Sequence, residues 1–242
     1  MSRRLGAVVA SLLLAAGCSS GAHGPMSSGA VTMTTSAALY VRGAVALPLG
    51  QPGKLTAIAV GPEDATGMIP IVVRNNTART VYNVGASGTA ERDGSPVTSV
   101  DTAMLSPEIV RPGEWAFGAI GFGGDSIGPV QRVELTPIAD PTPAYSARTR
   151  DLKIADAHVT HGSSSDVVAG TVVNSTDTTL TATPPPTVSV ICFSGTRPDE
   201  IGLGTGHATD RLRPGATSSF SISLARGSCE GSYALSARGV TR

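Results

Sequence analysis

The sequence predicts an all-β protein built from two tandem β-sandwich domains, and three observations lead to this fold class. The 242-residue chain contains many short apolar runs separated by its 29 Gly and 17 Pro residues. Long Leu/Ala/Glu/Lys patterns of the kind that form helices are missing after the N-terminal segment. Two short motifs also recur about a hundred residues apart. Short apolar runs punctuated by turn residues are typical of sandwiches and barrels.

The internal repeat is the observation that predicts two domains. Val72–Thr77 (Val-Val-Arg-Asn-Asn-Thr) matches Val172–Thr176 (Val-Val-Asn-Ser-Thr), and Val110–Gly113 (Val-Arg-Pro-Gly) matches Leu212–Gly215 (Leu-Arg-Pro-Gly). A period this long indicates two tandem domains, because the repeats of solenoids are shorter.

These matches and the composition divide the chain into five segments. We expect a signal peptide at 1–17, a flexible Ser/Gly/Thr tether at 18–37, and a first sandwich at 38–138. A Pro-rich linker at 139–149 then leads to a second sandwich at 150–242. Proline density favours an extended, semi-rigid spacer between the two domains.

The strands expected in the first domain are, in order, Leu39–Leu47, Leu55–Val60, Met68–Arg74, Val81–Ala90, Val97–Leu105, Trp115–Phe122 and Val130–Ile138. Trp115 and Phe117 fall on one face of their strand, whereas Ile120 and Phe122 fall on the other. A bulge near Gly118 would bring the four side chains to one face. Trp115 is then either a core residue or an exposed aromatic anchor for a partner.

The strands expected in the second domain are Leu152–Val159, Val167–Asn174, Val188–Phe193, Ser219–Leu224 and Tyr233–Ala237. Ser219–Leu224 alternates between serine and apolar residues, which indicates a strand with one buried face and one solvated face. Gly195–Gly206 is expected to be rich in loop structure.

The N-terminus has the order of a secretory signal peptide. A basic start at Arg3-Arg4 precedes the apolar run Leu5–Ala16, and small residues lead to Cys18. The apolar run is shorter than the roughly 20 residues that span a bilayer, so a permanent transmembrane helix is the weaker alternative. An ordinary signal peptide cut elsewhere is a second alternative.

Ala15-Ala16-Gly17-Cys18 resembles the lipobox of bacterial lipoproteins, with Ala15 where that family usually has leucine. The resemblance implies that Cys18 is lipidated and becomes the new N-terminus. It also implies a protein held on the extracytoplasmic face of the cell membrane. The family's diacylglyceryl group, often with a third chain, anchors stably, whereas one acyl chain holds a protein only weakly.

The C-terminal half resembles a second known group. The residues that carry this resemblance are Val172-Val173-Asn174, Leu180, Val188–Phe193 and the run from Leu212 to Phe220. They are similar to the FxLYD-type, immunoglobulin-like domains of bacterial envelope lipoproteins, and the first domain matches more weakly. The resemblance implies a β-sandwich with an interaction-type role and without catalytic residues.

Charge and cysteine content limit the partners and the compartment. Arg3 and Arg4 leave with the signal peptide, so 16 basic residues face 18 acidic ones, and no basic surplus supports nucleic-acid binding. With Cys18 lipidated, Cys192 and Cys229 remain as an even pair in a compartment where disulfides persist. We expect a disulfide between them, with two separate buried thiols as the alternative. A zinc site would need further ligands nearby.

Residues with catalytic or metal-binding potential are few. Gly124-Asp125-Ser126-Ile127-Gly128 fits the G-x-S-x-G motif of serine hydrolases, but Pro129 follows and no helix is expected there, so we interpret it as a turn. His158 and His161 would lie on opposite faces of a strand. Together with His207 they could still converge on a metal ion, but we expect no metal site. His23 and Met26 would be the ligands of a copper carrier, but isolated His and Met residues in a Gly/Ser linker are more often inert.

The sequence thus favours a lipid-anchored, non-catalytic binding or accessory module of the cell envelope, with no cofactor. Its expected contacts are the membrane, through lipid on Cys18, and an unidentified protein or cell-wall partner. A carrier of a small ligand or of a metal such as copper is the alternative function, and an envelope hydrolase using Ser126 is a remote one.

Overall fold

A computed structural model describes residues 38–63, 67–93, 95–122, 132–143, 148–181, 184–206, 211–225, 227 and 229–241. These residues form fourteen strands and no α-helix, which confirms the all-β fold class. Within the same residues no helix has the length and hydrophobicity to cross a membrane. The expected signal peptide, the tether and Cys18 lie outside the described residues.

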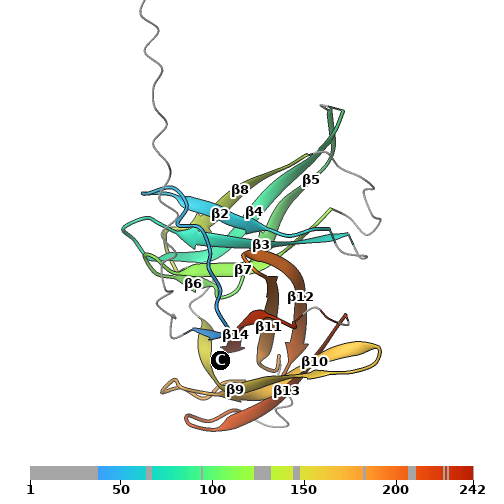
Figure 1. Cartoon of the computed structure of the whole chain (residues 1–242). Helices are drawn as coiled ribbons and strands as arrows, with labels where there is room; N and C mark the ends of the chain where they lie inside the picture. The colour runs from blue at the N-terminus through green and yellow to red at the C-terminus, as the bar shows by residue number, and fades with distance from the viewer. Residues whose placement is uncertain are drawn as a thin grey trace, which may run out of the picture.

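The N-terminal part is a sandwich of two antiparallel sheets (Figure 1). The first sheet has the order β2 (Leu55–Val60), β3 (Met68–Asn75), β7 (Trp115–Gly121). The second is centred on β4 and consists of β4 (Val81–Arg92), β5 (Ser95–Met104), β6 (Ile109–Val110) and β8 (Arg132–Asp140). The core between the two sheets includes Ile69, Ile71, Val73, Val84, Ala86, Leu105, Ala116 and Ile120.

The C-terminal part is a second sandwich, made of β9 (Thr149–His161), β10 (Ser165–Val173), β11 (Thr187–Ser194), β12 (Arg197–Thr205), β13 (Thr217–Ala225) and β14 (Ser232–Val240). Their order is β12-β11-β14-β9-β10-β13. β9 joins the two layers because its residues 149–152 pair with β14 and its residues 153–161 pair with β10. A bridge between Gly206 and Phe220 brings the end of β12 beside β13.

The first strand, β1 (Leu39–Arg42), belongs to the sheet of the C-terminal sandwich. It pairs antiparallel with β14, from Leu39 opposite Ser236 to Arg42 opposite Tyr233. The sequence predicts this segment as a strand of the first sandwich, together with the strands that follow it in the chain. The residues after β1 then cross to the N-terminal sandwich, and the side chains of Val45 and Leu47 are buried on the way.

A third apolar core lies between the two sandwiches. It includes residues from both, namely Leu39, Val45, Leu47, Ile58, Val72, Trp115, Phe117, Ile191, Phe193 and Ala234. β3, β7, β11 and β14 are therefore buried on both faces, which explains why apolar residues follow one another along them.

The two faces of β7 explain its aromatic residues without a bulge. Trp115 and Phe117 face the third core, whereas Ile120 faces the core of the N-terminal sandwich. The β3–β7 ladder runs without a register shift, so the expected bulge near Gly118 is wrong. Trp115 is only 2% exposed and packs edge-on against Phe193 at 6.2 Å between ring centroids. It is therefore a core residue and not an exposed anchor.

The internal repeat appears in the structure as two copies of one hydrogen-bonded turn. In the first copy, the buried Asn75 donates through Nδ2 to the carbonyl oxygens of Arg79 and Val110, at 2.8 and 2.9 Å. Its Oδ1 accepts from the backbone N–H and the hydroxyl of Thr77, at 3.0 and 2.6 Å. The asparagine thus ties the end of β3 to β6.

The second copy repeats these contacts. Asn174 donates to the carbonyl oxygens of Thr178 and Leu212 at 2.8 and 2.9 Å, and its Oδ1 accepts from Thr176. In both copies the Pro-Gly turn closes on the asparagine, because the N–H of Gly113 or Gly215 donates to its carbonyl oxygen. Both glycines have positive φ, which suits the third position of a Pro-Gly turn.

One segment was assigned wrongly from sequence. Gly195–Gly206 was expected to be a loop, but Arg197–Thr205 forms β12. A Cβ atom on Gly202 would lie 2.4 Å from Leu224, and one on Gly204 would lie 2.5 Å from Ile222. The glycines therefore make room for side chains of β13, and they mark a close approach between strands where the sequence suggested a loop.

Candidate functional site at the junction of the two sandwiches

The junction has a polar half beside the apolar third core. The hydroxyl of Ser106, just after β5, donates to the hydroxyl of Ser236 on β14 at 3.2 Å, and both side chains are buried. Two residues further along each segment, the guanidinium of Arg238 forms an ion pair with the carboxylate of Glu108. These two contacts join strands that are 130 residues apart in the sequence.

Asp151 is the most perturbed carboxyl group of this polar half. It lies opposite Arg238 in the β9–β14 ladder, and its Oδ1 is buried without a hydrogen-bond partner in the described structure. Burial raises the pKa of Asp151 from 3.8 to about 6. The guanidinium groups of Arg111 and Arg238 oppose this rise, whereas nearby carboxylates add to it.

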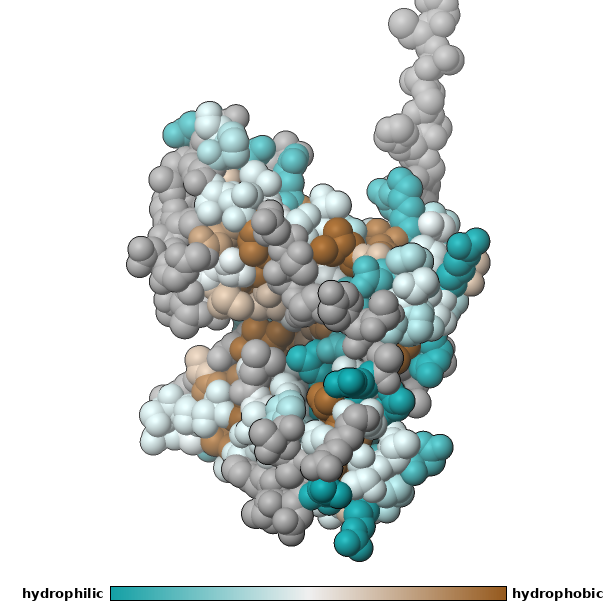
Figure 2. Space-filling view, turned by 180° about the vertical axis from the view of Figure 1, so that it is seen from behind, coloured by the Kyte–Doolittle hydropathy of each residue, from teal (hydrophilic) through white to brown (hydrophobic). Residues whose placement is uncertain are grey.

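A cavity of about 170 Å³ lies next to these polar groups. Its apolar wall comes mainly from the N-terminal sandwich, and its polar groups come from both; the lining consists of Met68, Leu105, Ser106, Phe117, Gly118, Ala119, Thr187, Ser189, Ile201 and Arg238. Figure 2 shows hydrophobic residues on the surface where the two sandwiches meet. Domain interfaces of this composition are common positions for ligand sites.

Ser189 contributes a hydroxyl group to the wall of the cavity. The residue is 7% exposed, and its hydroxyl forms no hydrogen bond within the described part of the chain. Because this hydroxyl lies on the wall of the cavity, it is available to form a hydrogen bond with a ligand or with water.

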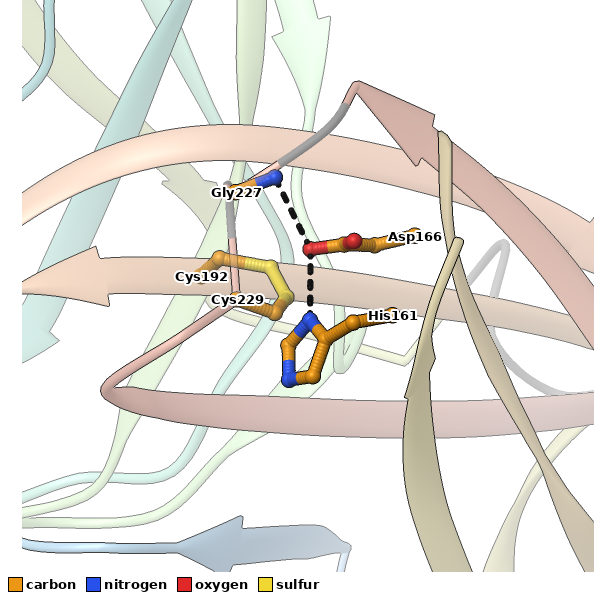
Figure 3. The surroundings of a disulfide bond; sticks show 5 residues. All are labelled: His161, Asp166, Cys192, Gly227 and Cys229. Atoms are coloured by element: carbon orange, nitrogen blue, oxygen red, sulfur yellow. Dashed lines mark hydrogen bonds and ion pairs between the residues drawn. A yellow bond between two sulfur atoms is a disulfide. The ribbon is translucent and has the colours of Figure 1, made fainter. Parts of the chain in front are cut away.

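A second polar cluster lies at the disulfide of the C-terminal sandwich (Figure 3). Cys192 and Cys229 form the expected disulfide, with Cα atoms 5.0 Å apart. Beside it, the buried carboxylate of Asp166 accepts from the backbone N–H of Gly227 at 3.1 Å and contacts Nδ1 of His161 at 3.1 Å. This cluster ties the segment before β14 to the β9–β10 hairpin.

The structure separates the histidines suggested as metal ligands. His158 and His161 both lie on β9, which is the strand predicted for this stretch. His161 contacts the carboxylate of Asp166, whereas His158 is exposed to solvent. Among the described residues, no group of three His, Cys, Asp or Glu side chains is placed to hold a metal ion. The remaining candidates His207, His23, Met26 and Ser126 lie outside the described residues.

The junction between the two sandwiches was not predicted from the sequence. One signal was present, because Val72-Val73 and Trp115–Phe117 supply apolar residues to both faces of their strands. Double-sided burial requires a second layer of protein over the sheet, which is what the C-terminal sandwich provides. Nothing in the sequence indicated that Ser106, Glu108 and Asp151 would meet Arg238.

In comparisons with known proteins, no family model matches this chain and no curated protein sequence is similar to it. The lipobox resemblance and the FxLYD-type resemblance are therefore carried by the residues quoted above alone.

Proposed function

We propose that this protein is a lipid-anchored, extracytoplasmic binding or accessory module of the cell envelope that acts without catalysis. Lipid on Cys18 would hold it at the membrane, and a protein or the cell-wall polymer would be its partner. The N-terminal sequence supports the anchor. The shared apolar core between the two sandwiches is the structural observation that carries the proposal.

The core matters because contacts between domains of one chain are commonly small and polar, which lets the domains move. Here Trp115 and Phe117 of one sandwich pack with Phe193 of the other, and β1 adds a strand from the chain's start to the far sheet. Such a junction holds both sandwiches in one orientation. A fixed orientation suits a protein that presents a binding surface at a set place above a membrane.

One outward surface is well placed for a partner. The outer face of the β9-β10-β13 layer carries small polar side chains in register, with Thr171 opposite Ser219 and Ala169 opposite both Ser221 and His158. Short hydroxyl side chains leave this face flat and able to form hydrogen bonds. It lies on the side of the C-terminal sandwich away from the junction (Figure 1).

The test is crosslinking in cells, with a photoreactive residue at Ser221 on this face or at the exposed Lys54 of the N-terminal sandwich as the matched control. Each form is compared with the same form carrying Cys18→Ser. The proposal expects one envelope component crosslinked to position 221, and only in the anchored form. Equal recovery from both positions, or recovery that is independent of Cys18, would contradict it.

A further inference from the structure

We propose that the cavity at the junction binds a small uncharged molecule with one ring and one hydrogen-bonding oxygen, such as a cyclic alcohol. This inference goes beyond the proposed function and does not depend on it, because the cavity is formed within the chain. Three features of the cavity select this class of ligand: its volume, the hydroxyl of Ser189 on its wall and the charges around it.

The volume sets the size of the ligand. The cavity measures about 170 Å³, and an apolar cavity of about 150 Å³ accommodates benzene. The apolar wall includes Phe117, Leu105 and Ile201. The space therefore holds one ring or an equally compact group, but not a long acyl chain or an oligosaccharide.

The polar lining sets the position of the oxygen. Ser189 has a hydroxyl without a partner, and Arg238 has five N–H donors, of which Glu108 occupies only part. Ser106 is already engaged with Ser236. A ligand hydroxyl can accept from Arg238 and donate to Ser189, so that both partners are satisfied while the ring covers the apolar wall.

The surrounding charges disfavour an anion. Three carboxylates, those of Glu108, Glu114 and Asp151, face the two guanidinium groups of Arg111 and Arg238 in this part of the junction. A carboxylate ligand would have to displace Glu108 from Arg238 and would add a fourth negative charge. A neutral ligand keeps the Glu108–Arg238 ion pair intact, and breaking such a partly buried pair is costly.

The sole tryptophan reports on this site. Trp115 packs against Phe117 with ring centroids 5.9 Å apart, and Phe117 lines the cavity. The probe is cyclohexanol, which absorbs no light in the tryptophan range, and the anionic comparator is cyclohexanecarboxylate. The full chain carries Cys18→Ser, so that neither lipid nor detergent competes for the probe. Binding is followed by tryptophan emission and by saturation-transfer NMR on the ligand.

We expect saturable binding of cyclohexanol, with cyclohexanecarboxylate at least about tenfold weaker. Ser189→Ala should weaken cyclohexanol about three- to tenfold, which is the effect of one hydrogen bond. Ala119→Leu, which fills the cavity from β7, should weaken it more than tenfold. Ser99→Ala on β5 and Ala155→Leu on β9, at exposed positions outside the cavity lining, serve as matched controls and should leave the affinity unchanged.

Three results would overturn the proposal. These are no saturable binding by either method, equal affinity of wild type and both cavity variants, or tighter binding of the carboxylate than of the alcohol. The unliganded emission spectrum shows whether each variant keeps its junction. A failed crosslink at Ser221 would refute the proposed partner surface and leave this result unaffected.

Discussion

Asp151 offers the sharpest test of the junction. Its pKa is raised from 3.8 to about 6 because it is buried between the two sandwiches. The folded protein therefore holds the Asp151 proton more tightly than the unfolded chain does. The contribution of this group to stability is greatest below pH 3.8 and is lost as the pH rises to about 6.

The magnitude follows from the shift. A rise of about two pKa units corresponds to roughly 3 kcal/mol at 1.36 kcal/mol per pKa unit. This is the amount by which ionised Asp151 lowers the free energy of unfolding at pH 7.5. At pH 4, where Asp151 is mostly protonated in the folded protein, the same calculation gives a destabilisation of less than about 1 kcal/mol. Asp151→Asn removes the ionisation and keeps the shape. It should therefore stabilise the protein by about 1–3 kcal/mol at pH 7.5, the lower value allowing for an imperfectly bonded amide.

The assay is urea unfolding of the full chain at pH 4 and pH 7.5, followed by tryptophan emission. Asp156→Asn is the matched control, because Asp156 is an exposed residue of the same strand. The reasoning fails if Asp151→Asn is no more stable than wild type at pH 7.5, or if its gain is the same at both pH values. It also fails if the Asp156→Asn control reproduces the gain.

Three further predictions concern the repeat, the disulfide and the shared core. Asn174→Ala removes four hydrogen bonds of a buried side chain and should lower the free energy of unfolding, measured in urea, by about 2–4 kcal/mol. Asn75→Ala should have a similar effect. A loss of unfolding free energy below about 1 kcal/mol in either variant would contradict the structural equivalence of the two asparagines. Cys229→Ser opens a loop of 37 residues and should cost about 3–4 kcal/mol, an effect that should disappear when both proteins are compared in reductant. Trp115→Ala should lower the free energy of unfolding by about 3–5 kcal/mol and increase proteolysis between the sandwiches. Unchanged proteolysis would argue that the third core does not hold the two sandwiches together.

Much of the fold was predictable because strand signals are local. Leu55–Val60 was expected with the bounds that β2 has, and the serine-alternating run Ser219–Leu224 lies inside β13. The Asn-x-Thr and Pro-Gly motifs also predicted turns, since asparagine side chains and positive-φ glycines produce turns wherever they occur. The pairing of Cys192 with Cys229 was predictable from the cysteine count once Cys18 was assigned to lipid.

The errors arose where a residue's role depends on what packs against it. Gly202 and Gly204 indicated a loop, but side chains of β13 occupy the space that their missing Cβ atoms leave. Two-sided burial of Trp115 and Ile120 suggested a bulge, because a sequence does not show that a second sandwich covers the sheet.

The sequence by itself determined the strand-rich character, the repeated turn and the two cysteines that pair, because these depend on side-chain alternation, backbone conformation and residue count. The signal-like N-terminus is likewise a local pattern, and its lipid remains a prediction. Only the tertiary structure decided that β1 joins the far sheet, that Ser189 and Arg238 line one cavity, and that Glu108 and Asp151 lie next to Arg238. Those contacts link residues that are far apart in the sequence, such as Leu39 with Ser236 and Glu108 with Arg238, and their existence depends on how two finished sandwiches fit together.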